Sequence, residues 1–77
     1  MDNLKNNIIR FNNTDYFVID ETSIDYNVYD LIINISNESD IKIIRQEVFN
    51  GKNVFVIENN ADIINKIKEK FKTSLNI

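Results

Sequence analysis

The apolar residues at the N-terminus are spaced as on one face of a helix. Leu4, Ile8 and Phe11 stand at positions i, i+4 and i+7, which predicts a short amphipathic helix over residues 3–12. The next apolar run, residues 15–19, has the sequence DYFVI. Its aromatic and β-branched side chains are typical of a strand. The first quarter of the chain is therefore expected to hold a helix followed by a strand.

The middle of the chain begins with a polar stretch and continues with a segment in which apolar and polar residues alternate. Residues 20–27, DETSIDYN, are polar and rich in turn formers, so we expect a loop there. Residues 29–35, YDLIINI, alternate between apolar and polar positions at their two ends. This pattern predicts a half-buried strand whose apolar face carries Tyr29, Leu31, Ile33 and Ile35, with Asp30 and Asn34 on the other face. Residues 36–40, SNESD, are expected to form a polar turn.

A second hairpin follows. Residues 41–49 and 54–58 are rich in Ile, Val and Phe, as strands usually are. Between them lies Asn50-Gly51, which contains the chain's single glycine. Both residue types tolerate a positive φ, so they suit a two-residue type I′ turn. The two strands are therefore predicted to pair antiparallel.

The C-terminal segment again has the helical period. Asn59 or Asn60 can cap a helix, and Asp62 in its first turn suits the positive end of the helix dipole. The apolar stripe of this helix consists of Ile63, Ile64, Ile67, Phe71 and Leu75. Taken together, the elements predict an α+β fold: an N-terminal helix, an antiparallel meander of three to four strands, and a C-terminal helix packed on one sheet face.

Length and composition restrict the classes of function. The chain has 77 residues, which we interpret as a single domain spanning residues 1–77. It contains no Cys and no His, so it has no thiolate nucleophile, imidazole base or disulfide framework. We therefore expect neither catalysis nor a cofactor nor a metal. No long apolar run or signal-peptide order is present, so no membrane association is expected and the expected compartment is the cytoplasm.

Charge is unevenly distributed along the chain. Residues 11–41, the acidic tract, hold seven acidic residues and no basic one, although the net charge of the whole chain is only −3. A surface of one sign steers a partner of the opposite sign and repels nucleic acid. The alternative interpretation is that these carboxylates only keep the protein soluble. The candidate partner-binding residues are Asp15, Asp20, Glu21, Asp25, Asp30, Glu38 and Asp40, together with Tyr26 as the best candidate for an exposed aromatic contact.

The sequence also resembles a known family. An ungapped match over about residues 3–37 includes Leu4 and Ile8, then Asp15-Tyr16 followed by Val18, then Leu31-Ile32-Ile33 and Asn37. A looser match over about residues 55–71 includes Phe55-Val56-Ile57, Ile63-Ile64 and Phe71. On these residues the chain resembles the small phage-encoded anti-CRISPR proteins that inhibit Cas9.

The resemblance implies an acidic decoy that occupies the effector's DNA-reading site and blocks target recognition. Asp15 matches an acidic contact residue of that family by aligned position, and Glu38 and Asp40 lie in the corresponding loop. The chain departs from the family in an extra segment around residues 41–52, and its last helix is basic where the family is acid-rich. The expected partner is accordingly a basic nucleic-acid-binding protein, with CRISPR-Cas effectors as the leading class.

Two other functions fit the sequence. The hairpin over residues 41–58 has the composition of an edge that pairs with its copy in a homodimeric interaction module. Alternatively, the last helix carries four lysines that suit phosphate contacts, namely Lys66, Lys68, Lys70 and Lys72. Because these are spaced by two, they spread over several helix faces. Direct nucleic-acid binding is therefore the less favoured alternative.

Overall fold

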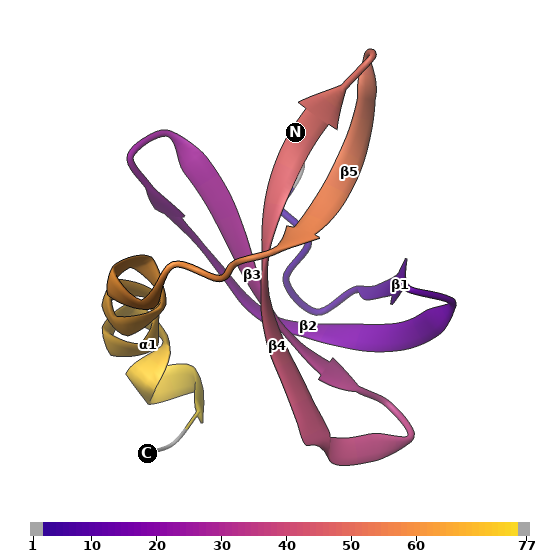
Figure 1. Ribbon diagram of the computed structural model, residues 1–77. Coiled ribbons are helices and arrows are strands. Elements are labelled where there is room, and N and C mark those ends of the chain that lie inside the picture. The colour runs from indigo at the N-terminus through magenta and orange to yellow at the C-terminus, as the bar shows by residue number, and fades with distance from the viewer. Residues whose placement is uncertain (1–2, 76–77) are drawn as a thin grey trace.

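The computed structural model describes residues 3–75, with side chains from Asn3 to Lys72 (Figure 1). Five strands are followed by one helix: β1 Ile8–Phe11, β2 Thr14–Ile24, β3 Asn27–Asn34, β4 Asn37–Phe49, β5 Lys52–Ile57 and α1 Ala61–Leu75. The strands lie in one sheet in the order β1-β2-β3-β4-β5, and every neighbouring pair is antiparallel. The sheet is thus a simple meander with β1 and β5 as its outer strands.

Short turns made by residues with positive φ connect most of the strands. Asn12-Asn13 joins β1 to β2, Asp25-Tyr26 joins β2 to β3, and Asn50-Gly51 joins β4 to β5. Positive φ at both central residues gives the backbone twist that matches twisted strands. The prediction of a hairpin at Asn50-Gly51 is confirmed, since Asn50 has φ 51° and Gly51 φ 76°.

The predicted N-terminal helix over residues 3–12 is wrong. Residues 8–11 form β1, and Asn12-Asn13 turns the chain back into β2. Of the three residues that suggested the helix, Phe11 is buried but Ile8 is 62% exposed. The segment contains Asn3, Asn6 and Asn7, and asparagine and β-branched residues are poor helix formers. The helical spacing was therefore coincidental.

The predicted loop over residues 20–27 is also wrong. β2 continues to Ile24, and the connection to β3 consists of Asp25 and Tyr26 alone. A register shift between Val18 and Asp20 marks a bulge in the long strand. The polar residues that suggested a loop are paired with β3, as Glu21 is with Asp30. The turn predicted over residues 36–40 is shorter than expected, since β4 begins at Asn37.

The sheet buries side chains on both of its faces. One cluster contains Phe11, Tyr16, Val18, Ile32 and Ile44, and Leu4, Ile9 and Phe55 pack against it. Because residues of both outer strands contact this cluster, the sheet coils around it. The second cluster lies under α1 and contains Tyr29, Leu31, Ile67 and Phe71, with Ile19, Ile24, Ile43 and Ile63 packed against it. Tyr29 to Ile32 are consecutive buried residues, so the middle of β3 is buried on both faces of the sheet and is not half-buried as predicted.

The helix begins where its cap was predicted. Asn60 Oδ1 accepts hydrogen bonds from the backbone N–H groups of Asp62 and Ile63 at 2.9 and 3.3 Å. α1 then packs over the sheet through Ile67 and Phe71, whereas the predicted role of Leu75 lies outside the described side chains. The predicted α+β class, with a helix at each end, is therefore corrected to a five-stranded antiparallel meander with one C-terminal helix. Within the described residues, no helix is long and apolar enough to cross a membrane.

Candidate functional site

Two carboxylates of the acidic tract meet inside the coiled sheet. Glu21 on β2 and Asp30 on β3 are direct cross-strand partners, so their side chains lie on the same face. Gln46 of β4 lies on that face too, and its Nε2 donates to Glu21 Oε1 and to Asp30 Oδ2, each at 2.7 Å. The backbone N–H of Leu4 also donates to Glu21 Oε1, at 3.4 Å. These three side chains form the buried carboxylate cluster.

The cluster is short of hydrogen-bond donors. Asp30 is fully buried, and its Oδ1 has no hydrogen-bond partner among the described residues; the same holds for the buried Gln46 Oε1. Burial, followed by the neighbouring Glu21 carboxylate, raises the pKa of Asp30 from 3.8 to about 7. Two adjacent carboxylates in a dry site favour sharing a proton. Asp30 is therefore an interior carboxyl group with a raised pKa and not a surface contact for a partner protein.

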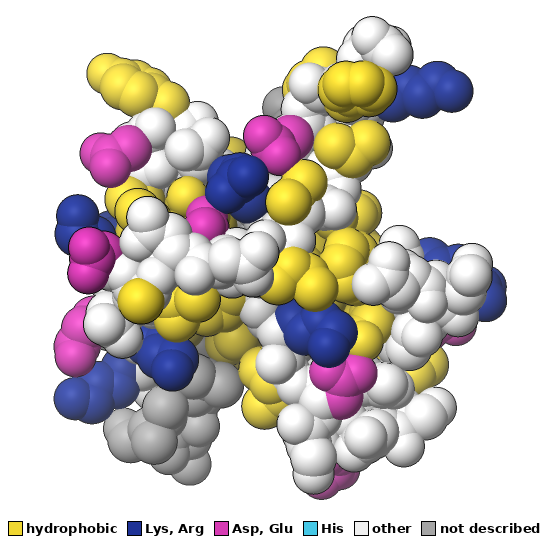
Figure 2. Space-filling view, viewed as in Figure 1, with side chains coloured by type: hydrophobic (Ala, Val, Ile, Leu, Met, Phe, Trp, Pro, Cys, Tyr) yellow, Lys and Arg dark blue, Asp and Glu magenta, His cyan; other side chains and the backbone are white. Residues whose placement is uncertain are grey.

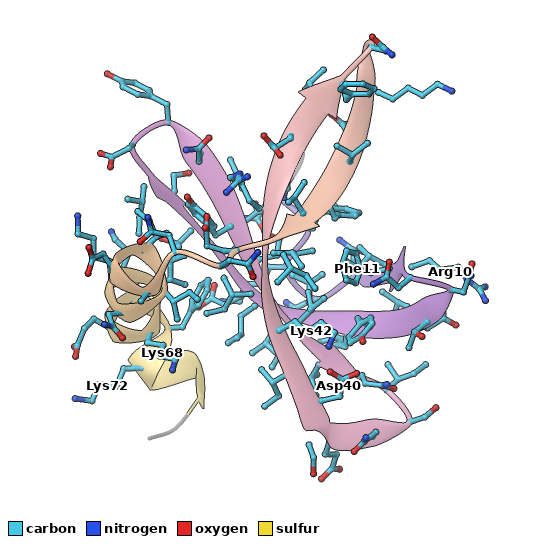
Figure 3. The ribbon with its side chains drawn as sticks, viewed as in Figure 1. Arg10, Phe11, Asp40, Lys42, Lys68 and Lys72 are labelled. Atoms are coloured by element: carbon cyan, nitrogen blue, oxygen red, sulfur yellow. The ribbon has the colours of Figure 1, made fainter. Side chains whose placement is uncertain are left out.

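A second polar group ties three strands together through Asp40. Its Oδ2 accepts hydrogen bonds from Tyr16 Oη at 2.7 Å and from Asn34 Nδ2 at 3.1 Å, and its Oδ1 accepts one from Lys42 Nζ at 2.7 Å (Figure 3). The Lys42 ammonium, followed by the Tyr16 hydroxyl, lowers the pKa of Asp40 from 3.8 to about 2. The Asp40 carboxylate thus links side chains of β2, β3 and β4.

Basic residues from outside the acidic tract neutralise several of its carboxylates. Ion pairs join Arg10 to Asp15 at 3.9 Å, Lys5 to Asp20 at 3.8 Å and Lys42 to Asp40 at 2.7 Å. In the view of Figure 2, acidic and basic side chains are interspersed over the surface. The meander folds the flanking segments back beside the tract, so a stretch of one sign in the sequence does not become a surface of one sign at these positions.

Asp25, Tyr26 and Glu38 are the candidate residues that remain exposed. No ion pair among the described residues involves Asp25 or Glu38. Asp25 lies in the β2–β3 turn, whereas Glu38 follows the β3–β4 turn. The two carboxylates therefore belong to different hairpin ends and do not form one patch.

Tyr26 has an unusual position for an aromatic residue. It is fully exposed, and its φ is 69°, a left-handed conformation that costs free energy for side chains other than Gly, Asn and Asp. Such a residue contributes little to the packing of its own domain. The exposure of Tyr26 agrees with the sequence-based expectation, although the loop around it is only a two-residue turn.

Strands β4 and β5 carry several exposed apolar side chains, although these do not form one patch, since Ile41 lies beyond the part of β4 that pairs with β5. Of the seven large apolar residues exposed in the described part of the chain, four belong to these two strands: Ile41, Val48, Phe49 and Ile57. Val48 and Phe49, 69% and 66% exposed, lie at the hairpin tip. Within residues 3–75, the outer strand β5 pairs with β4 alone. An outer strand with unpaired backbone groups and apolar side chains is a site for pairing with another chain.

An ion pair between half-buried Arg45 and buried Glu58 fixes the junction between the hairpin and the helix. Glu58 Oε1 accepts a hydrogen bond from Arg45 Nη1 at 2.6 Å, and Glu58 Oε2 accepts the backbone N–H groups of Asn59 and Asn60 at 3.1 Å. Burial alone would raise the pKa of Glu58, but the Asn60 N–H and the Arg45 guanidinium outweigh it and lower that pKa. The carboxylate thus holds the start of α1 against β4.

The sequence analysis did not identify Gln46, Arg45 and Glu58 as site residues. It placed Asp30 on the polar face of a half-buried strand. One signal was available, because Leu31, Ile32 and Ile33 are consecutive apolar residues, as in a strand buried on both faces. That pattern implies burial of Asp30. The partners of Glu58 and of Asp30 come from distant positions, so nothing in the local pattern identifies them.

The remaining candidate sites are the lysine-rich helix and a possible metal site. Lys66, Lys68, Lys70 and Lys72 are all exposed on α1, together with Asp62 and Glu69. Among the residues that the structure describes, no three acidic side chains are grouped as metal ligands. Comparison of the chain with protein-family models, curated proteins and solved structures gave no match.

Proposed function

We propose that this chain is a protein-interaction module that forms a symmetric dimer by pairing the β5 strands of two copies. The observation that carries the proposal is the outer strand β5, which is paired on one side only and belongs to the hairpin with the most exposed apolar residues. Pairing of two such strands satisfies backbone groups that otherwise face solvent. In a two-fold symmetric dimer, both copies contribute the same surface to the interface.

The sequence of β5 suits antiparallel self-pairing. Its single charged residue is Lys52, at its first position, and residues 53–57 contain neither charge nor proline. Natural outer strands are usually protected by such residues. In an antiparallel pair the two Lys52 ammonium groups lie at opposite ends of the joint ladder, whereas a parallel pair would bring them together. Charge therefore favours the two-fold arrangement.

Sedimentation velocity over a range of concentrations tests the proposal. Val54→Lys places a charge in the middle of β5, opposite Glu47 of β4, so the folded monomer can form a new local ion pair while two copies repel each other. Ser23→Lys is the matched control, because Ser23 is an exposed residue of the inner strand β2. We expect the wild type and the control to dimerise and Val54→Lys to remain monomeric. A wild type that stays monomeric at high micromolar concentration contradicts the proposal.

A second candidate function is inhibition of a basic nucleic-acid-binding protein, with CRISPR-Cas effectors as the leading class. The strained and fully exposed Tyr26 beside the exposed carboxylate of Asp25 supports it. Such a tip offers an aromatic anchor and a charge for an Arg or Lys of the partner.

Pull-down by a panel of effectors at low and high salt tests this second function. Binding should weaken with salt and with Asp25→Lys or Tyr26→Gly, while Glu47→Lys, a charge reversal on β4, should leave it unchanged. Failure of every effector to bind, or binding that is insensitive to both Asp25→Lys and Tyr26→Gly, would remove this candidate.

A further inference from the structure

A cavity of about 450 Å³ lies where α1 meets the sheet. Its walls come from β3, β4, the end of β5 and one side of α1, and most of its lining side chains are apolar, among them Leu31, Ile43 and Ile64. The charged residues around it are Lys42, Glu58 and Lys68. Small-molecule sites in proteins have this size and this mixture of an apolar wall with few polar groups.

The cavity exists because the helix covers the sheet incompletely. α1 packs through Ile67 and Phe71 on Tyr29 and Leu31 of β3. Ile41, which is farther along the sheet on β4 and also lines the cavity, remains 44% exposed. The space between Ile64 on the helix and Ile41 on the strand therefore has apolar walls on both sides.

The charged side chains at the cavity differ in whether they already have a partner within the protein. Both Glu58 oxygens accept hydrogen bonds, from Arg45 and from the backbone, and Lys42 Nζ is held by Asp40 at 2.7 Å. Lys68 is exposed and takes part in no ion pair among the described residues. In Figure 3, Lys68 lies on the side of α1 toward the sheet, whereas Lys72 points away from it. The cavity thus offers one ammonium group above an apolar wall.

We propose that this cavity binds an amphipathic carboxylate, with an alkyl chain against Leu31, Ile43 and Ile64 and a carboxylate on Lys68. One ammonium group matches one carboxylate, and a charge-assisted hydrogen bond is stronger when an adjoining wall excludes water. A neutral ligand would leave Lys68 without a counter-charge, and a cationic one would be repelled by Lys68. The site is separate from the outer backbone of β5, although Ile57 belongs both to that strand and to the cavity lining.

NMR titration of the folded protein with decanoate, below its micelle concentration, tests the proposal. We expect saturable shifts at the amides of Leu31, Ile43 and Ile64. Lys68→Gln should weaken decanoate binding about tenfold and leave the binding of decanol unchanged. Lys66→Gln is the matched control, since Lys66 is exposed on the same helix and does not line the cavity. A second variant, Ile41→Asn, changes a half-exposed wall residue and should weaken both ligands.

Three results would overturn the inference. They are the absence of saturable shifts, shifts confined to the hairpin tip at Val48 and Phe49, and equal effects of Lys68→Gln and Lys66→Gln. Sedimentation of each sample with and without decanoate shows whether the dimer changes. Because decanoate binding is measured directly, its outcome does not depend on whether the chain dimerises.

Discussion

Gln46 donates a hydrogen bond from Nε2 to Asp30 Oδ2 at 2.7 Å, in the interior of the sheet where Asp30 is fully buried. The same nitrogen also donates to Glu21, so one amide is shared between two carboxylates. A fully buried carboxylate beside a second, half-buried one is costly when both are ionised, because the shared amide satisfies neither of them fully. The stability of the fold should therefore depend on the proton held at this cluster.

The first prediction concerns pH. Because burial raises the pKa of Asp30 from 3.8 to about 7, the native state holds a proton that the unfolded chain loses between these values. The contribution of Asp30 is thus fully present below about pH 4 and is lost as the pH rises to 7, by up to about 1.4 kcal/mol per pH unit. Asp30→Asn should be more stable than the wild type by roughly 1–3 kcal/mol at pH 8.

Urea unfolding at pH 4.5, 6 and 8 measures this effect. The advantage of Asp30→Asn should disappear at the lowest of these pH values. Asp25→Asn removes a carboxylate from an exposed turn and should unfold with the pH dependence of the wild type. Parallel curves for the wild type and Asp30→Asn would show that Asp30 is not protonated in the native state.

The second prediction concerns acid. Hydrogen bonds from Lys42 and Tyr16 lower the pKa of Asp40 from 3.8 to about 2, so its contribution is present above about pH 4 and is lost as the pH falls toward 2. Asp40→Asn should be less stable than the wild type at pH 6, and this difference should shrink in acid. Thermal unfolding is measured at pH 6 and in acid near pH 2. Exposed Glu38→Gln is the control, which distinguishes the loss of the Asp40 hydrogen bonds from a general effect of charge. A difference that does not vary with pH would rule it out.

The third prediction concerns the junction of β5 and α1. Glu58→Gln weakens a charge-assisted hydrogen bond from Arg45 and the acceptor for two backbone N–H groups. We expect a loss of about 1–3 kcal/mol in the free energy of unfolding. Glu47→Gln removes a more exposed partner of the same Arg45, at 3.3 Å, and should cost less than about 1 kcal/mol. Equal costs in chemical unfolding would mean that Glu58 does not hold the junction.

The fourth prediction concerns the β4–β5 turn. Gly51 has φ 76°, and an added Cβ would meet no atom within 4 Å, so Gly51→Ala introduces backbone strain without a clash. The expected cost is about 1 kcal/mol, measured by urea unfolding against Lys52→Ala. A neutral Gly51→Ala would indicate that the turn can change its conformation at no cost.

The sequence predicted those elements whose signals are local. The turn at Asn50-Gly51 and the cap at Asn60 depend on neighbouring residues alone, and both occur as expected. The N-terminal helix was wrong because Leu4, Ile8 and Phe11 have helical spacing by coincidence, while the turn at Asn12-Asn13 determines the pairing of β1.

The acidic tract shows why the candidate site was harder to predict than the hairpin. Charge along the sequence becomes charge on a surface only after distant segments are placed. The N-terminal segment and β1 place Lys5 beside Asp20 and Arg10 beside Asp15, and the meander encloses Asp30. These relations involve several strands, so the composition of the tract alone does not contain them.

Hydrogen–deuterium exchange of the β5 amides at low and high protein concentration tests the proposed dimer most directly. Backbone N–H groups on the outer side of β5 exchange freely in a monomer and become protected when another strand pairs with them. We expect exchange within residues 52–57 to slow as the concentration rises, and the exposed turn at Asp25-Tyr26 to be unaffected. Exchange rates in β5 that are the same at every concentration would contradict the proposed pairing.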